Sequence, residues 1–369
     1  MRTILVVLVV ALFTNNAIAQ KKYQGKPLIL AGKRNLTIGI GQERYPERWG
    51  ISPEIANDTL KVPLYGKTEV VVFKTDIDSI KFTVKGGESK SFYIKLGDTK
   101  PAHTIITAKP FVWDQVNYSN VEARKDLTIY YRNSKSTYFD SLSRKYPIAQ
   151  LIKKGQSDMQ KVLSILNWTH HQWKHDGNNA PKGNDAISIL NEVKAGGRFP
   201  CFAYAIVLRD QLISQGFKAR VLYLKTKDAS TRKGSPGHVA TEVFLNDQKK
   251  WVFIDGQFNV IPTLKGKPLN AVEFQKALSN TYNEVVLASR DKVSKRGYTE
   301  FVYDYLYYFD TSLDNRGLPA TQNFKLEGKT SLMLVPVGAP HLEKIDFWNS
   351  KVNYCIYTNS IKDFYTEPK

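Results

Sequence analysis

The sequence predicts an α+β protein built around a central mixed domain, and three observations lead to this class. Short β-type runs at regular spacing occupy residues 62–108, helical periodicity begins near Gln150, and strands follow the last helix. A content of 42% hydrophobic and 12% aromatic residues excludes a disordered chain. The 369 residues suffice for two or three domains with hydrophobic cores.

Charge and cysteine content limit the class of partner. Lys and Arg number 53 against 34 Asp and Glu, which gives a net charge of +19, and there are only 2 cysteines. Two cysteines exclude a disulfide-stapled scaffold and a multi-cysteine zinc module. Basic chains attract anionic partners, but here the basic residues are dispersed and form no run of five. We therefore expect a solvated surface and no nucleic-acid partner.

Residues 1–19 have the pattern of a signal peptide. Arg2 precedes an uncharged apolar run, Ile4–Phe13, and the segment ends in the small-x-small sequence Ala17-Ile18-Ala19. The apolar run is too short for a stable anchor helix, although an uncleaved membrane anchor is the alternative. We expect cleavage before Gln20, a secreted or periplasmic protein, and no integral membrane segment after signal removal.

A polar arm over residues 20–61 and a β-rich domain over residues 62–140 are predicted next. The arm is Gly-rich and punctuated by prolines, and whether it acts as an inhibitory pro-segment stays open. Turn residues such as Gly86-Gly87 separate the β-type runs that follow, a spacing typical of a small antiparallel sheet or sandwich. The predicted strands are Glu69–Lys74, Ser79–Val84, Ser91–Leu96 and Thr104–Ala108.

Residues 141–290 form the predicted catalytic domain, with helices first and strands after them. Each helix has its own start or stop signal: one begins at Ser157 with a capping box completed by Gln160, Ala186–Val193 stops at Gly196-Gly197, and Pro200–Gln215 stops at Gly216. The predicted strands are Ala219–Leu224, His238–Leu245 and Trp251–Asp255.

The last predicted region, residues 291–369, contains β-type runs and packs against the catalytic domain. Its runs are Ser331–Val337 and Val352–Tyr357, and an aromatic stretch, Phe301–Phe309, precedes them. The tyrosines of that stretch are expected to form a core stripe, with a ligand groove as the alternative.

Cys201 is the first candidate for chemistry because it lies in the first turn of a long apolar helix. The unpaired N–H groups and the positive dipole end there favour thiolate over thiol. The same N–H groups can donate to an oxyanion that forms on an attacked carbonyl. A lone cysteine on an apolar helix is usually a small buried side chain, so a nucleophile also needs a base and an orienting group.

Strand register supplies these two groups. If Asn246-Asp247 form a two-residue hairpin turn, His238 lies directly opposite Asp255, and both side chains point to the same face. Asp255 then fixes the imidazole tautomer and leaves the other ring nitrogen for Cys201. The alternatives are a plain turn at Asp255-Gly256 and an ordinary histidine at a loop edge.

The segment Trp168–Phe258 resembles the transglutaminase-like superfamily. Its most specific part, Gly197–Leu224, contains Gly-x-x-x-Cys-x-x-Tyr-Ala, an apolar helix and Gly-Phe-Lys-Ala-Arg-Val; Gly237-His238-Val239 and Trp251–Asp255 complete it. The resemblance implies a papain-like core, in which the cysteine helix packs on an antiparallel sheet, and chemistry on peptide or glutamine-type amides through a thioester. It implies that Cys201 is the nucleophile, His238 the general base and Asp255 the orienting acid.

The resemblance also implies an upstream side chain at the oxyanion site. Trp168, Gln172 and Trp173 are the candidates, although the helical pattern explains both tryptophans equally well as core residues. The closing stretch Ser360–Pro368 resembles the ends of secreted bacterial members.

Two further combinations of cysteine and histidine are weighed and set aside. A Cys201–Cys355 disulfide would consume the nucleophile, so Cys355 is expected to be a buried core residue. His170, His171 and His175 suggest a metal, but Gln172 stands where a metalloprotease helix needs glutamate. A packed or solvated helix end is therefore expected, with no metal and no cofactor.

These observations predict an exported cysteine enzyme that is most readily hydrolytic, a peptidase or amidase. Nothing in the sequence resembles the calcium-binding loops or large accessory domains of cross-linking enzymes. The alternatives are a protein-glutamine γ-glutamyltransferase and a non-catalytic peptide- or glycan-binding module with a vestigial triad. The expected partner is a peptide, protein or glycopeptide, and the charge of the loop Lys225–Pro236 favours acidic substrates.

Overall fold

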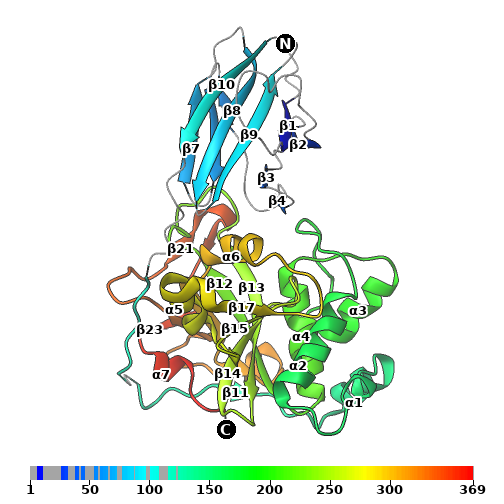
Figure 1. Cartoon of the computed structure of the whole chain (residues 1–369). Helices are drawn as coiled ribbons and strands as arrows, with labels where there is room; N and C mark the ends of the chain where they lie inside the picture. The colour runs from blue at the N-terminus through cyan, green and yellow to red at the C-terminus, as the bar shows by residue number, and fades with distance from the viewer. Residues whose placement is uncertain are drawn as a thin grey trace. The chain divides into compact units, whose positions relative to one another are not determined.

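The computed structural model describes residues 115–121 and 124–368 in full and, before residue 115, the backbone of strands β1–β10. The chain divides into two compact units, Met1–Val112 and Trp113–Lys369. Figure 1 shows the first unit as strands only and the second as mixed helices and strands. No helix in the described part of the chain has the length and hydropathy that crossing a membrane requires.

The first unit is a β structure. Its strands are β1 (Val6–Val10), β2 (Lys26–Ala31), β3 (Ile38–Ile40), β4 (Glu43–Tyr45), β5 (Glu54–Ala56), β6 (Thr59–Leu64), β7 (Lys67–Val72), β8 (Ile77–Gly86), β9 (Glu88–Leu96) and β10 (Lys100–Thr107). They pair in the orders β10-β8-β9-β1-β2, β5-β6-β7 and β3-β4. Strands β7–β10 overlap the four strands predicted from sequence.

Two predicted segments of this unit take part in these sheets. The apolar run of the predicted signal peptide contains β1, which pairs with β2 and β9 in the full-length chain. Residues 20–61, expected to be a polar arm, contain β2–β5 and the start of β6. The apolar run Leu28–Leu30 lies within β2, and such a run suits a strand.

The second unit contains the helices. They are α1 (Thr137–Lys145), α2 (Asp158–His170), α3 (Ala186–Lys194), α4 (Cys201–Ser214), α5 (Ala271–Thr281), α6 (Lys295–Tyr303) and α7 (Ile361–Phe364). The three helices predicted from the sequence correspond to α2, α3 and α4. Ser157 caps α2 in a capping box with Gln160, Asp185 caps α3, and Pro200 precedes α4. The side chains of Ser157 and Asp185 accept hydrogen bonds from first-turn amides that helix geometry leaves without intrahelical acceptors, whereas Pro200 makes no side-chain cap.

A six-stranded sheet organises this unit, in the order β14-β13-β12-β18-β20-β23. Its strands are β12 (Lys218–Lys225), β13 (Gly237–Leu245), β14 (Lys250–Ile254), β18 (Tyr308–Ser312), β20 (Ser331–Leu334) and β23 (Cys355–Thr358). Half of them come from the predicted C-terminal region, which therefore completes the central sheet.

Shorter strands form small sheets around this one. They are β11 (Tyr130–Tyr131), β15 (Ile261–Leu264), β16 (Lys267–Pro268), β17 (Val285–Ala288), β19 (Asp314–Asn315), β21 (Lys344–Ile345) and β22 (Ser350–Lys351). Strand β11 pairs with β19, and Phe139 of α1 is buried in the core. The segment Tyr130–Phe139 thus packs within the second unit.

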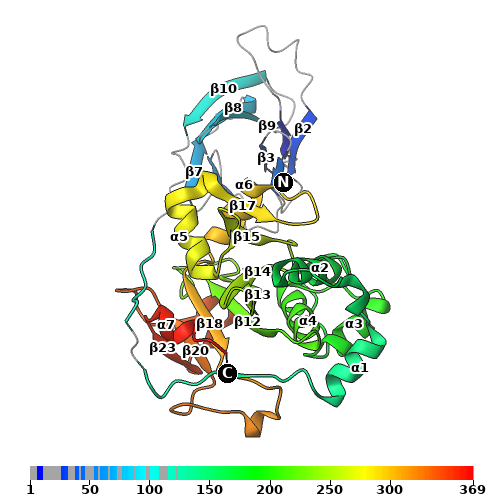
Figure 2. The same cartoon turned by 60° about the horizontal axis from the view of Figure 1, so that its bottom comes forward.

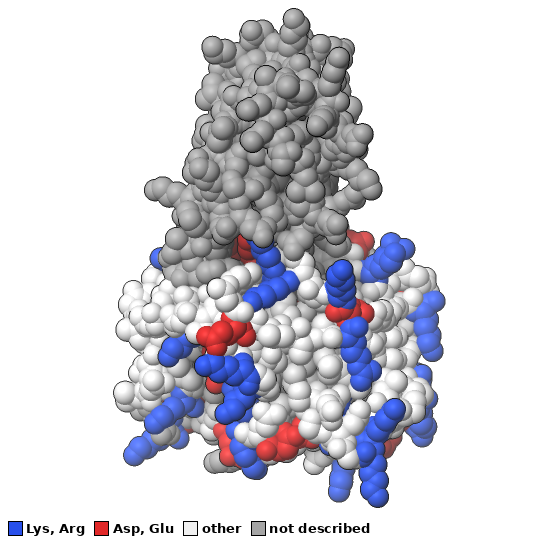
Figure 3. All heavy atoms as spheres, viewed as in Figure 1, with Lys and Arg blue, Asp and Glu red and all other residues white. Residues whose placement is uncertain are grey.

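Hydrophobic cores cover both faces of the sheet, and two of them contain most of the unit's helices. One joins buried side chains of α1–α4 to those of β12–β14, and the other joins α5 and α6 to β18 and β20. Figures 1 and 2 show α1–α4 gathered on one side of the sheet and α5 on the other. On the face in Figure 3, Lys and Arg are scattered among uncharged side chains, with Asp and Glu between them.

The hairpin β13–β14 has a longer turn than predicted. Leu245 pairs with Lys250 and Thr241 with Ile254, so the connection has four residues, and His238 is not directly opposite Asp255. The tip of the hairpin lies against the start of α2: the Asp158 amide donates to Asp247 Oδ2 at 2.9 Å, and the Asn246 amide donates to Asp158 Oδ2 at 2.9 Å. A shift of two residues keeps every side chain on its predicted face.

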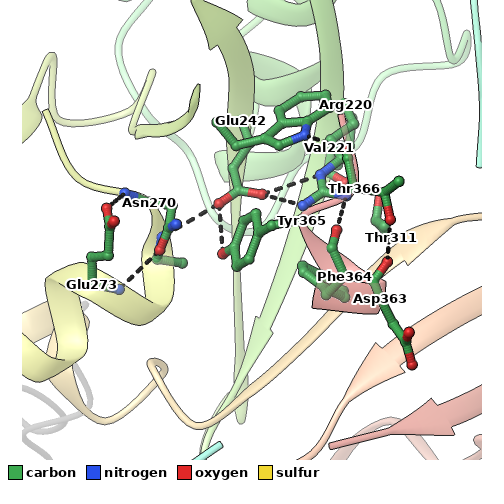
Figure 4. Close-up of polar contacts among 12 residues, drawn as sticks. Arg220, Val221, Glu242, Asn270, Glu273, Thr311, Asp363, Phe364, Tyr365 and Thr366 are labelled. Carbon is green, nitrogen blue, oxygen red and sulfur yellow. Dashed lines mark hydrogen bonds and ion pairs between the residues drawn. The ribbon is translucent and has the colours of Figure 1, made fainter. Parts of the chain in front are cut away.

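A buried ion pair ties the C-terminal segment to this sheet (Figure 4). Arg220 on β12 donates from Nε and Nη2 to Glu242 Oε2 on β13, at 3.1 and 2.7 Å, and both side chains are fully buried. Arg220 Nη1 also donates to the Phe364 carbonyl at 2.8 Å, and Tyr365 Oη donates to Glu242 Oε1 at 2.9 Å. These contacts satisfy both buried charges, as buried ion pairs require.

Candidate active site

Cys201 is the first residue of α4, and its side chain is partly exposed. The turn before it is compact: a Cβ on Gly197 would lie 2.8 Å from the Glu192 carbonyl and 2.7 Å from the Phe199 ring. Only glycine fits there without displacing backbone. The short Gly-Gly entry thus places the sulfur at the amino end of a buried helix, next to the backbone amides of its first turn.

Helix α4 is fixed in place by contacts on both flanks. Tyr204 Oη donates to the Trp173 carbonyl at 2.8 Å, and the two rings stack with centroids 4.1 Å apart. On the sheet side, Thr241 Oγ1 of β13 donates to the Ala205 carbonyl at 3.1 Å. The strand that carries His238 is therefore attached directly to the first turns of the cysteine helix.

His238 and Asp255 form a buried hydrogen-bonded pair. His238 Nε2 lies 2.7 Å from Asp255 Oδ2, and the two residues are 2% and 0% exposed. Because Asp255 occupies Nε2, the ring nitrogen Nδ1 is left for Cys201. Burial lowers the pKa of His238, but the charge and hydrogen bond of Asp255, with a smaller contribution from Cys201, raise it from 6.5 to about 10. The site favours an imidazolium.

Asp255 is itself held by three donors. Its Oδ1 accepts from the amides of Gln257 and Phe258 at 3.0 and 3.3 Å. Its Oδ2, which faces His238, also accepts from Tyr298 Oη at 3.0 Å. Tyr298 is buried on α6, and burial together with the Asp255 charge raises the pKa of its phenol well above the usual value. Tyr298 therefore stays a donor and keeps the carboxylate oriented.

An aromatic wall surrounds the imidazole. The rings of Phe258, Phe301 and Tyr305 lie with centroids 6.2, 5.2 and 5.9 Å from that of His238. Burial raises the pKa of Tyr305 to about 12, against the opposing charge of Arg232. The wall keeps water from His238 and strengthens its attraction to Asp255.

Sequence reasoning did not identify Tyr298, Phe301 and Tyr305 as site residues. The aromatic stretch that starts at Phe301 was visible, but a core stripe was the preferred interpretation. Nothing local in the sequence indicates that α6 lies against the His238–Asp255 pair.

The three oxyanion candidates lie near α4, but two of them already use side-chain donors elsewhere. Trp173 is buried, and its indole Nε1 donates to the Phe199 carbonyl at 3.1 Å. Gln172 Nε2 donates to the Trp168 carbonyl at 2.8 Å. Trp168 packs, partly buried, against the first core. The backbone amides in the first turn of α4 are further candidate donors to an oxyanion.

Two other sequence expectations have clear outcomes. Cys355 is buried on β23, both cysteines are free, and burial raises the pKa of the Cys355 thiol above its usual value. Lys225, expected to add charge to the loop before His238, is instead buried in an ion pair with Asp310. Arg232 of the same loop pairs with Asp304 at 3.0 Å. Acids neutralise these two cations, which weakens the case for acidic substrates.

An exposed aromatic hairpin covers the start of β13. Strands β21 and β22 flank a 3₁₀ turn, Asp346–Trp348, in which Phe347 and Trp348 are each 47% exposed. A Cβ on Gly237 would lie 2.6 Å from Trp348 Cη2, so the indole packs on a position that only glycine leaves open. Gly237 directly precedes His238, and the hairpin therefore borders the strand that carries the imidazole.

Comparison with known proteins identifies the central fold. Residues 147–256 match the family model of the transglutaminase-like superfamily. The segment is a transglutaminase-like core. It contains Cys201, His238 and Asp255 and has the cysteine helix packed on the sheet, as the resemblance implied. No curated protein matches the chain.

The chain is also similar to a solved structure of a candidate cysteine protease from Cytophaga hutchinsonii. The sequence identity is 12%, the match covers 59% of this chain and 77% of that chain, and the TM-score is 0.27. A likeness of this size carries no argument about activity.

The environment of His238 predicts an unusual titration. We expect the His238 imidazole to lose its proton near pH 10. In the Asp255→Asn variant it should lose the proton at much lower pH, because the carboxylate charge that raises the pKa is removed while the burial that lowers it remains. The protonated His238 contributes fully to the free energy of unfolding below about pH 6.5. This contribution is lost as pH rises through about 10. NMR of ¹³C-labelled histidine measures both values. Identical titrations in the two proteins would contradict the pairing.

Tyr298 is expected to act as a positioning residue. Tyr298→Phe removes one hydrogen bond to Asp255 Oδ2, and we expect kcat, and the rate at which iodoacetamide alkylates Cys201, to fall about tenfold, with KM unchanged. Tyr308→Phe is the matched control, because its buried hydroxyl donates to the Pro340 carbonyl instead. Equal effects of the two substitutions on alkylation would indicate a purely structural role.

Proposed function

We propose that this transglutaminase-like protein is a cysteine enzyme that cleaves peptide or glutamine-type amides through a thioester. The observation that carries the proposal is the 2.7 Å contact between His238 and Asp255, beside a cysteine at a helix start. A buried, oriented imidazolium next to a thiol is the arrangement that activates a sulfur nucleophile. Cys201 is the proposed nucleophile, His238 the proton carrier and Asp255 the orienting group.

In the proposed reaction the Cys201 thiolate attacks the amide carbonyl carbon, and a carbon–sulfur bond forms. The amides at the start of α4 donate to the oxyanion. The carbon–nitrogen bond then breaks, the amine leaves with a proton from His238, and a thioester remains on Cys201. Water loses a proton to His238 as it attacks the thioester, and the acid departs as the carbon–sulfur bond breaks.

Hydrolysis and transfer differ only in the group that accepts the acyl chain. We propose water, and the rival acceptor is a lysine amine, which would make the protein a cross-linking enzyme. One experiment separates the two: the purified protein is incubated with a peptide library and a tagged primary amine. Cleaved or deamidated peptides support hydrolysis, and incorporation of the tag supports transfer. Neither product, together with unchanged peptide binding by Cys201→Ala, would favour the binding module.

We propose further that Phe347 and Trp348 bind an apolar side chain next to the attacked amide. Both rings are half exposed, and Trp348 lies against the residue that precedes His238. Trp348→Ala is expected to raise KM about tenfold for peptides with an aromatic residue there, with little change in kcat, because a ground-state contact is lost. Peptide cleavage assays with matched glycine peptides supply the control. Equal losses on both peptides would contradict the assignment.

Export belongs to the same proposal. The sequence pattern of residues 1–19 supports it, and mass spectrometry of protein recovered from outside the cytoplasm is expected to give an N-terminus at Gln20. Retention of Met1 in that material would contradict cleavage.

A further inference from the structure

A second group of chemically versatile side chains lies beside the active site and takes no part in the proposed reaction. His170 is the last residue of α2, His171 is its C-cap, and Asp291 lies between β17 and α6. One ligand atom from each residue lies within 4.8 Å of the other two. Both histidine Nε2 atoms face the same carboxylate oxygen, Asp291 Oδ2, at 3.7 Å from His170 and 3.5 Å from His171.

Backbone acceptors fix the tautomer of both rings. His170 Nδ1 lies 3.2 Å from the Gly256 carbonyl, and His171 Nδ1 lies 2.8 Å from the Asn167 carbonyl. A carbonyl oxygen only accepts, so Nδ1 must carry the hydrogen in each ring. In the neutral rings, Nε2 is then a lone pair. The two Nε2 lone pairs then face the same carboxylate oxygen, an arrangement that a bound cation would stabilise.

The distances fit metal ligands better than a hydrogen-bonded ion pair. Separations of 3.5 and 3.7 Å exceed the range for a charged hydrogen bond. Tetrahedral ligands at about 2.0–2.1 Å from zinc lie about 3.4 Å apart. The carboxylate is oriented by Asn259, whose Nδ2 donates to Asp291 Oδ2 at 2.7 Å. Metal-binding histidines usually donate their second ring N–H to a carbonyl, and metal-binding carboxylates usually accept a further hydrogen bond. The three residues have these outer partners.

We propose that His170, His171 and Asp291 bind a divalent transition metal, with zinc as the ion to test. Two imidazoles and one carboxylate suit such an ion, and the carboxyl end of α2 adds a favourable dipole for a cation. The side chain of His171 is 53% exposed, which gives the ion access from solvent. This assignment differs from the sequence expectation of a helix end without a metal. Of the three histidines considered there, His170 and His171 belong to the site and His175 does not.

The site is connected to the active site through the backbone. His170 donates to the carbonyl of Gly256, which follows Asp255, and Asp255 in turn accepts from the next two amides. A metal on His170 holds this turn in place and so supports the orientation of Asp255. The metal itself touches none of the proposed reacting atoms, and the inference does not depend on the proposed function.

The test is zinc titration by calorimetry on tag-free, chelator-treated full-length protein that carries Cys201→Ala, so that the active-site thiol cannot bind the ion. We expect one equivalent to bind with a micromolar or tighter Kd. Adding His171→Ala or Asp291→Asn should raise Kd at least about 100-fold. His175→Ala is the control and should leave Kd unchanged. Zinc should also raise Tm in the Cys201→Ala protein and not in its His171→Ala derivative.

Cobalt provides a spectroscopic check on the ligand set. Visible bands of tetrahedral intensity without a thiolate charge-transfer band are expected in the Cys201→Ala protein, and their loss in the Asp291→Asn derivative supports the site. Binding weaker than about 100 μM, or binding that survives both ligand substitutions, would overturn the proposal. His171 is exposed, so its replacement leaves the fold intact and the comparison interpretable.

Discussion

Replacement of Cys201 by alanine is expected to lower kcat/KM at least about 10⁴-fold, because the thioester pathway loses its only nucleophile. The sulfur is partly exposed at the start of α4, and its substitution leaves the packing of the helix on β12 and β13 unchanged. Amide cleavage in the library assay, with thermal unfolding in parallel, measures the effect on activity separately from that on folding.

The second cysteine provides the matched control for this result. Cys355 is buried on β23, and burial raises the pKa of its thiol, so it is a poor nucleophile. Cys355→Ala should keep the activity and lose some stability, whereas Cys201→Ala should lose the activity and keep its stability. Activity that survives in Cys201→Ala and is lost in Cys355→Ala would refute the assignment of the nucleophile.

Glu242→Ala is expected to destabilise the second unit by about 3–5 kcal/mol. The substitution leaves the Arg220 guanidinium fully buried without its carboxylate, and it also removes the acceptor of Tyr365 Oη. The rings of Trp251 and Phe364, both with centroids 4.5 Å from Arg220 Cζ, remain but do not replace a negative charge. Urea unfolding measures the free-energy difference.

A double variant separates the ion pair from simple loss of packing. Arg220→Met combined with Glu242→Leu removes both charges and keeps most of the buried volume, so much of the lost stability should return. If the double variant is no more stable than Glu242→Ala, the loss comes from packing and from the docking of residues 364–366, and the electrostatic account fails.

Local signals explain most of what sequence reasoning predicted correctly. Ser157 and Gln160 form their capping box within four residues, and Gly197 admits the tight turn before Cys201 wherever the helix later packs. Alternation along two strands placed His238 and Asp255 on one face. That prediction withstood a wrong turn length, because the observed register differs from the predicted one by an even number of residues.

Contacts between distant segments explain what the sequence did not reveal. The four-residue turn is stabilised by Asp158, which lies 89 residues from Asp247 in the chain. Tyr298 reaches Asp255 across 43 residues, and Asp291 meets His170 and His171 from a different loop. Lys225 looked like a surface charge, yet its partner Asp310 lies on a neighbouring strand of the same sheet.

The amino-acid sequence by itself therefore determined helices α2, α3 and α4, the cysteine at a helix start and the shared face of His238 and Asp255. These features depend on neighbours within one turn of helix or on the two-residue period of a strand. Only the tertiary structure decided the hairpin register, the aromatic wall around His238 and the hydrogen bond from the Tyr298 hydroxyl to Asp255. Each of these depends on which distant surfaces pack together, and that choice is made by the burial of the whole core rather than by any local pattern.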